Sequence, residues 1–127
     1  GCSTALQGSD RIASDDPLLM LELARLDIEI EIPELLGKSI KALERVVRIE
    51  EDNNVAWRLL SIAYGREGRM AESALASGEQ ALLEGRPKDA LLHANHALGI
   101  VPEGSPGWLR AQDIYYFATR QNSAAGR

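Results

Sequence analysis

Proline and glycine divide this chain into short segments, and their positions constrain its fold more than any other feature of the sequence. Proline is favoured at the first position of a helix, because the amide hydrogen that it lacks has no partner there and its fixed φ is already helical. Four prolines stand at such starts: Pro17, Pro33, Pro87 and Pro106. Gly68 and Gly85 stand where helices should end, because glycine takes the left-handed conformation there without strain.

Polar residues beside these breaks are suited to cap the helices. Asp16 precedes Pro17 and Ser105 precedes Pro106, so each offers a side-chain oxygen to an unpaired amide of the first turn. Asn53 or Asn54 marks a further start in the same way. We therefore expect about six helices within one domain over residues 15–120. Segments 1–14 and 121–127 show no periodicity and are expected to be a flexible N-terminal segment and a flexible tail.

Apolar residues recur at helical spacing in the first two of these segments. One face of the first helix should carry Leu19, Leu23, Leu26 and Ile30. The matching face of the second helix should carry Leu36, Ile40, Leu43 and Val47. Both segments are therefore predicted to be amphipathic helices whose apolar faces pack together.

One short segment, 28–32, also alternates between isoleucine and glutamate, and would be typical of a strand if it stood alone. A strand needs a partner with which to pair, and the rest of the chain offers no second strand pattern. We therefore prefer the helical interpretation and expect an all-α fold.

The later helices carry rows of small residues instead of leucine. The fourth helix should place on one face Ala71, Ala74, Gly78 and Ala81. The fifth should do the same with Ala90, Ala94 and Ala97. Small side chains let two helix backbones approach closely, so these rows predict tightly stacked helices in the C-terminal half.

Charge and hydropathy argue against two classes of partner. The chain has 19 acidic and 14 basic residues, a formal net charge of −5, and no run of lysine and arginine. Phosphate backbones and anionic lipids would be repelled on average, so we do not expect nucleic acid as a partner. The longest apolar stretch, 17–21, is far shorter than the roughly 20 residues that span a bilayer. We expect no direct membrane insertion.

Few residues of the chain could carry chemistry. His93 and His96 are spaced for two ligands on one side of a metal ion, but zinc takes three or four ligands, and His93 is followed by Ala94, so no H-E-x-x-H motif occurs. The acidic groups at 15–16 and 50–52 stand at helix ends, where carboxylates meet the helix dipole or solvate a turn. We expect no catalytic residue, no metal site and no cofactor in this chain.

Cys2 is the only cysteine, so the chain has no disulfide framework. Gly1-Cys2-Ser3 is compatible with a lipoprotein signal, in which the cysteine is lipidated, but we prefer to interpret it as a junction left by truncation or cloning. The presence of Gly1 argues against the first reading, because cleavage in that pathway falls directly before the cysteine.

The third and fifth helices resemble the tetratricopeptide repeat, a helix-turn-helix unit of about 34 residues. Trp57, Leu60 and Tyr64 match its first helix, although Ser61 replaces the usual glycine. The positions of its second helix are matched by Ala90, Ala97 and Pro102. The resemblance implies a tetratricopeptide-like solenoid that binds protein or peptide.

The phase of this repeat is irregular. Trp108 and Tyr115 match the Trp and Tyr positions of a next repeat, but Trp108 lies one and a half repeats after Trp57. The fourth helix must then serve both as the second helix of one unit and as the first helix of the following one. The repeats are therefore expected to be degenerate, and Glu51 in place of a proline after the second helix agrees with this.

Stacked repeats form a concave surface that holds a peptide. In tetratricopeptide proteins first helices line this groove, and the matching positions of the third helix are Val55, Arg58, Ile62 and Arg66. Arginine can donate two parallel hydrogen bonds to a carboxylate, so these four residues are candidates for peptide binding. Either arginine is also compatible with an ordinary solvated position.

Three strings give a closer resemblance: AWRLLSIAYGREG at 56–68, EQALLEGRPKDALLHANHAL at 79–98 and PEGSPGWLRAQDI at 102–114. They are similar to the C-terminal repeat region of periplasmic Ste-type zinc metallopeptidases, the group that includes the β-barrel assembly-enhancing protease. The resemblance implies a non-catalytic tail in the bacterial periplasm or envelope that recruits or positions protein substrates or assembly partners. Zinc would belong to an upstream catalytic domain, and no zinc ligand of that family matches a position here. The alternative is a free-standing envelope scaffold, lipid-anchored through Cys2, and a cytoplasmic location stays open.

Overall fold

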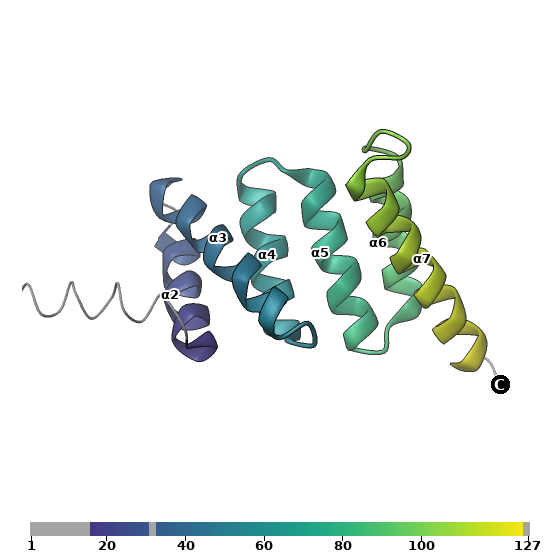
Figure 1. Ribbon diagram of the computed structural model, residues 1–127, viewed down its shortest axis with the longest axis horizontal. Helices are drawn as coiled ribbons and strands as arrows, with labels where there is room; N and C mark the ends of the chain where they lie inside the picture. The colour runs from purple at the N-terminus through teal and green to yellow at the C-terminus, as the bar shows by residue number, and fades with distance from the viewer. Residues whose placement is uncertain (1–15, 31–32, 126–127) are drawn as a thin grey trace, which may run out of the picture.

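The computed structural model describes residues 16–30 and 33–125, and in those ranges the chain forms six α-helices and no strand. The helices are α2 (Pro17–Ile30), α3 (Pro33–Ile49), α4 (Asn54–Arg66), α5 (Met70–Leu83), α6 (Pro87–Leu98) and α7 (Pro106–Ala125). Consecutive helices pack against one another, and α2 and α7 lie at opposite ends of the molecule (Figure 1). The predicted all-α class and the six predicted helices are confirmed. Every described helix is too short or too polar to cross a membrane.

Helix ends follow the predicted breaks. The side-chain oxygens of Asp16, Asn53 and Ser105 each accept a hydrogen bond from a backbone amide two or three residues later, at 3.0, 3.0 and 3.2 Å. Gly68 and Gly85 have φ of 77° and 68°, in the left-handed region that glycine adopts without strain. Two of the turns between helices are thus set by glycine, and three helix starts by a polar cap.

The ambiguous segment 28–32 is helical as far as the structure describes it. α2 continues to Ile30, while Glu31 and Ile32 lie outside the described residues, as do 1–15, which include the predicted N-terminal segment and Cys2. At the other end α7 continues to Ala125 instead of ending at Arg120. The amide of Gln121 donates to the carbonyl oxygen of Leu82 at 3.2 Å, which holds this extension against α5.

Bulky side chains fill the core of the N-terminal half. The predicted apolar face of α3 is buried as expected, with Leu36, Ile40, Leu43 and Val47 all at most 8% exposed. The predicted face of α2 was wrong: Leu19 and Leu26 are exposed, and Met20 and Ala24 point into the core. α2 is apolar on almost every side, so its spacing alone could not select the buried row.

Small side chains build the core of the C-terminal half, as the sequence predicted. Ala81, Ala90, Ala94 and Ala97 are fully buried, and Gly78 is buried with them. A Cβ atom on Gly78 would lie only 3.2 Å from Cγ2 of Ile114, so the absence of a side chain lets α7 approach α5. The close stacking of α5, α6 and α7 therefore depends on small residues.

The stacking order changes in the middle of the chain. Besides its neighbours in sequence, α2 contacts α4, and α5 contacts α7. In a regular array of two-helix units, the first helix of each unit contacts the first helix of the next unit. α2 would then contact α4, and α4 would contact α6. The contact of α5 with α7 departs from that pattern, so the stacking changes at α5.

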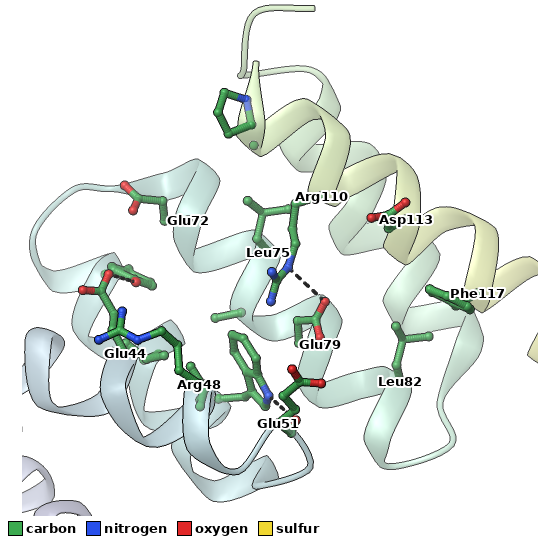
Figure 2. Close-up of a pocket in the computed structure, with 17 residues that line it drawn as sticks. Glu44, Arg48, Glu51, Glu72, Leu75, Glu79, Leu82, Arg110, Asp113 and Phe117 are labelled. Atoms are coloured by element: carbon green, nitrogen blue, oxygen red, sulfur yellow. Dashed lines mark hydrogen bonds and ion pairs between the residues drawn. The ribbon is translucent and has the colours of Figure 1, made fainter. Parts of the chain in front are cut away.

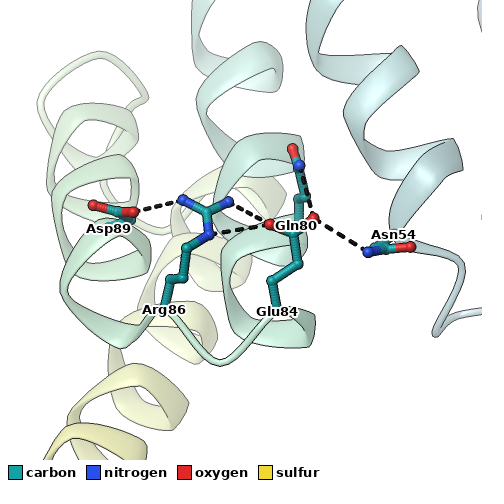
Figure 3. Close-up of polar contacts among 5 residues, drawn as sticks. All are labelled: Asn54, Gln80, Glu84, Arg86 and Asp89. Carbon is teal, nitrogen blue, oxygen red and sulfur yellow. Dashed lines mark hydrogen bonds and ion pairs between the residues drawn. The ribbon is translucent and has the colours of Figure 1, made fainter.

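Polar side chains join the ends of α4, α5 and α6 on the outer surface (Figure 3). The carboxylate of Glu84 accepts hydrogen bonds from Asn54 at 3.1 Å and Gln80 at 3.0 Å, and pairs with Arg86 at 2.7 Å. Arg86 also reaches Asp89 at 2.5 Å. The bonds from Gln80 and Arg86 hold the pKa of Glu84 below its usual value. Because these groups are exposed, the network orients the helix ends more than it stabilises them.

Candidate functional site

A groove of about 790 Å³ runs between α3 and α7, with α4 and α5 as its floor (Figure 2). We call it the α3–α7 groove. It is lined by residues of four helices and of the turn after α3: Glu44, Val47, Arg48, Glu51, Trp57, Leu60, Tyr64, Glu72, Leu75, Ala76, Glu79, Leu82, Pro106, Gly107, Arg110, Asp113 and Phe117.

Aromatic and aliphatic side chains form the floor of the groove. Trp57 and Tyr64, each about one turn from Leu60 on α4, are buried except for 8% and 7% of their surface. The indole Nε1 of Trp57 donates to the backbone oxygen of Glu51 at 2.9 Å, which fixes the ring against the turn after α3. The floor is therefore apolar, with its one indole donor already satisfied.

One end of the floor is closed by Tyr64 and its polar partners. The Tyr64 hydroxyl donates to Oε2 of Glu44 on α3 at 2.6 Å, and the Arg69 guanidinium lies over the Tyr64 ring, 4.6 Å from its centroid. Arg69 is itself paired with Glu72. Burial, together with the bond to Glu44, raises the pKa of Tyr64 well above its usual value, so this phenol stays neutral and keeps α3 joined to α4.

Arg110 of α7 spans the other part of the groove. Its Nε lies 3.3 Å from Oε1 of Glu79 on α5, and its guanidinium carbon lies 5.4 Å from the centroid of the Trp57 ring. Figure 2 shows the side chain extending from α7 toward the floor. Burial raises the pKa of Glu79, while Arg110 acts in the opposite direction. One guanidinium thus contacts both the Glu79 carboxylate beside the floor and the Trp57 ring of the floor.

The groove is acidic. Its lining holds five carboxylates, those of Glu44, Glu51, Glu72, Glu79 and Asp113, against the two guanidinium groups of Arg48 and Arg110. This formal net charge of −3 compares with −5 for the entire chain. Glu51 and Asp113 are exposed, and their negative charges contribute to the raised pKa of Glu79. A large part of the chain's excess negative charge is therefore concentrated around one apolar floor.

The peptide-binding residues predicted from the repeat lie on the face of α4 that points away from the α3–α7 groove. Val55, Arg58, Ile62 and Arg66 are all exposed and share one side of the helix, and none of them lines the α3–α7 groove. The structure therefore brings the four together as a surface stripe, on the other side of α4 from Trp57, Leu60 and Tyr64. The stripe stays a predicted site, separate from the groove.

Sequence reasoning missed the walls of the groove, although their spacing holds a signal. On α7, Arg110, Asp113 and Phe117 stand at i, i+3 and i+7, which places them on one face. Glu44 and Arg48 are one turn apart on α3. Each of these two sets could be recognised in the sequence as one helix face. The sequence does not show that α3 and α7 face each other across α4 and α5, because this depends on the tertiary arrangement.

The two tryptophans are not in equivalent surroundings. Trp57 is buried, whereas Trp108 is half-buried near the start of α7. The tyrosines differ in the same direction, since Tyr64 is 7% exposed and Tyr115 is 41% exposed. Trp108 and Tyr115 of α7 are thus more exposed than the matching residues of α4.

The histidines lie apart from the groove, on α6. His93 is half-buried against Gly78, and burial lowers its pKa, while His96 is exposed. Within residues 16–30 and 33–125, no three His, Cys, Asp or Glu side chains are grouped closely enough to hold a metal ion. Cys2 lies outside these ranges.

Comparison with known proteins adds no relative: no family model, no curated protein and no solved structure matches this chain.

Proposed function

We propose that this chain is a non-catalytic, protein-binding module of the tetratricopeptide type, and that it binds a segment of another polypeptide in the α3–α7 groove. The groove itself carries the proposal. It combines a buried apolar floor with charged walls on two facing helices, the combination that fixes both the affinity and the orientation of a bound chain.

The repeat pattern supports the same function. Trp57, Leu60 and Tyr64 match the first helix of a tetratricopeptide unit and line the α3–α7 groove, whereas the peptide-binding positions of that unit fall on the outer stripe of α4. Helical repeats of this kind use extended surfaces, built by successive helices, to hold peptides. The arrangement of α3, α4, α5 and α7 offers such a surface, although with a change of phase at α5.

The location and parent of the module are also proposed from the sequence. Its strings at 56–68, 79–98 and 102–114 support a place in the C-terminal region of a periplasmic zinc metallopeptidase, where it would recruit or position protein substrates or assembly partners. The complete gene tests this idea. An H-E-x-x-H motif encoded upstream is expected, and a reading frame that starts shortly before Gly1 would leave only the free-standing envelope scaffold.

Binding in the groove can be tested with a steric block that does not depend on charge. In a Cys2→Ser background, Phe117→Cys places a single thiol in the groove, and Tyr116→Cys places one beside it on the same helix, outside the lining. The two native side chains are 53% and 54% exposed, so both thiols should react with a bulky maleimide.

Peptides selected from a phage-displayed random library on the unmodified protein serve as the probe. We expect their binding to be lost when position 117 is labelled and kept when position 116 is labelled. Failure to select any peptide, or equal binding by both labelled proteins, would contradict the proposal.

A further inference from the structure

We infer that the polypeptide held by the α3–α7 groove is basic: a segment in which a lysine or arginine stands next to an apolar residue. This inference rests on the proposed function and adds the chemical class of the ligand. Its cation would lie between the acidic walls, in the part of the groove that Arg110 now occupies, and its apolar neighbour would lie on the floor beside Leu75 and Phe117.

The first argument is charge complementarity. The lining has an excess of three negative charges over an apolar floor, so it attracts a positively charged segment within about a Debye length and repels an acidic one. Complementary potentials of this kind also raise the rate at which the correct partner arrives and suppress wrong partners.

The second argument is that the groove contains one cation already, in a defined geometry. Arg110 lies over the Trp57 ring and against the Glu79 carboxylate, contacts that combine a cation–π interaction with an ion pair. The walls and floor of the groove are thus chemically suited to a guanidinium or ammonium group. Arg110 acts as an internal occupant with which an incoming basic side chain competes.

The third argument concerns the carboxylates that Arg110 leaves over. Glu44 accepts from Tyr64, and Glu72 is paired with Arg69. Within the described part of the chain, the side chains of Glu51 and Asp113 take part in no hydrogen bond or ion pair. Burial is the main cause of the raised pKa of Glu79, and the negative charges of Glu51 and Asp113 add to it. Arg110 pairs with Glu79, so the charges of Glu51 and Asp113 stay uncompensated in the groove, and a second cation would neutralise part of them.

The test uses the full chain and the same displayed random peptides. Charge reversal by Glu51→Lys with Asp113→Lys changes two exposed groove residues, and Glu22→Lys with Glu103→Lys makes the same total change at exposed positions outside the lining. Peptides that depend on the groove should be enriched in lysine or arginine beside an apolar residue. Their affinity should fall by roughly tenfold or more in the groove variant. It should fall by much less in the control, because the control changes no charge of the groove lining.

Arg110→Gln provides an opposite prediction. It removes the internal cation and frees Glu79, so the affinity for a selected basic peptide should rise several-fold, and the gain should shrink in high salt. A merely structural role for Arg110 would lower the affinity or leave it unchanged. Thermal unfolding of each variant checks that the fold is retained.

Two outcomes would overturn the inference and spare the proposed function. In the first, the groove-dependent peptides are neutral or acidic. In the second, light scattering shows that the chain alone forms a dimer abolished by the groove variant, which makes a second copy the occupant. If position 117 labelling blocks no peptide, the proposed function fails together with the inference.

Discussion

The indole Nε1 of Trp57 donates a hydrogen bond to the backbone carbonyl oxygen of Glu51, 2.9 Å away. This bond joins the first turn of α4 to the turn that follows α3 and holds the ring on the floor of the α3–α7 groove. It also gives Trp57 a structural role that Trp108, half-buried on α7, shares only in part.

Replacing the two tryptophans should therefore have unequal effects. Trp57→Phe should cost about 1–3 kcal/mol of stability, because the buried site loses both a hydrogen bond and part of its packing. Trp108→Phe should cost less than about 1 kcal/mol, because Trp108 is only half-buried. Urea unfolding of both variants measures the difference. Equal losses of stability would show that the two tryptophans contribute equally to the fold.

The bond between Tyr64 and Glu44 should make stability depend on pH in the alkaline range. Folding raises the pKa of Tyr64 above its value of about 10 in the unfolded chain, so the stabilisation is complete below pH 10 and is lost as the pH rises further. Tyr64→Phe cannot titrate. The wild type should lose more stability than this variant between neutral and strongly alkaline pH, as followed by chemical unfolding; parallel losses would exclude the effect.

Glu79 should act in the acidic range. Burial raises its pKa above the value of about 4.3 in the unfolded chain, so its contribution to stability is present at low pH and declines as the pH rises through the folded pKa. Glu79→Gln removes this loss. The stability of the variant relative to the wild type should increase between pH 3 and neutrality. Melting temperatures of both proteins across that range test this prediction. A decrease in the relative stability of the variant would show that the ion pair of Glu79 with Arg110 outweighs the effect of burial.

Two helical glycines should respond in opposite ways to the same substitution. Gly65→Ala gains helix propensity of up to about 1 kcal/mol, since the nearest atom to its new Cβ, Oγ of Ser73, would be at an ordinary 3.6 Å. Gly78→Ala makes the same gain but brings Cβ to 3.2 Å from Ile114, which is 1% exposed and tightly packed. We expect it to be less stable than Gly65→Ala by roughly 1–3 kcal/mol. In an Ile114→Val background, which lacks the Cδ1 atom 3.3 Å from the same Cβ position, Gly78→Ala should lower the stability by less than it does in the wild type, as urea unfolding would show.

Local rules were sufficient for the helices of this chain. Proline at Pro33, Pro87 and Pro106, caps at Asp16 and Ser105 and glycine at helix ends act within a few residues, so they are visible in the sequence, and the structure places the starts where they predict. The end of α7 was predicted less well, because its last turns have no apolar stripe and are held instead by the contact from Gln121 to a helix distant in sequence.

Packing direction and the candidate site were less accessible. Nothing in the spacing of α2 distinguishes Met20 from Leu19, since the choice depends on where α3 and α4 lie. The repeat pattern predicted Val55 and Arg58 as groove positions, but the structure places them on an exposed stripe of α4. The groove on the other side of α4 could not be predicted, because it needs Arg110 to be placed opposite Trp57 by the stacking of α5, α6 and α7.

Nuclear magnetic resonance titration of the labelled chain with a selected basic peptide tests the central claim most directly, because it compares the two faces of α4 in one experiment. Binding in the groove predicts that the largest amide shifts fall on Glu51, Leu75, Glu79, Arg110 and Asp113. Shifts concentrated instead on Val55, Arg58, Ile62 and Arg66 would contradict it and place the ligand on the outer stripe.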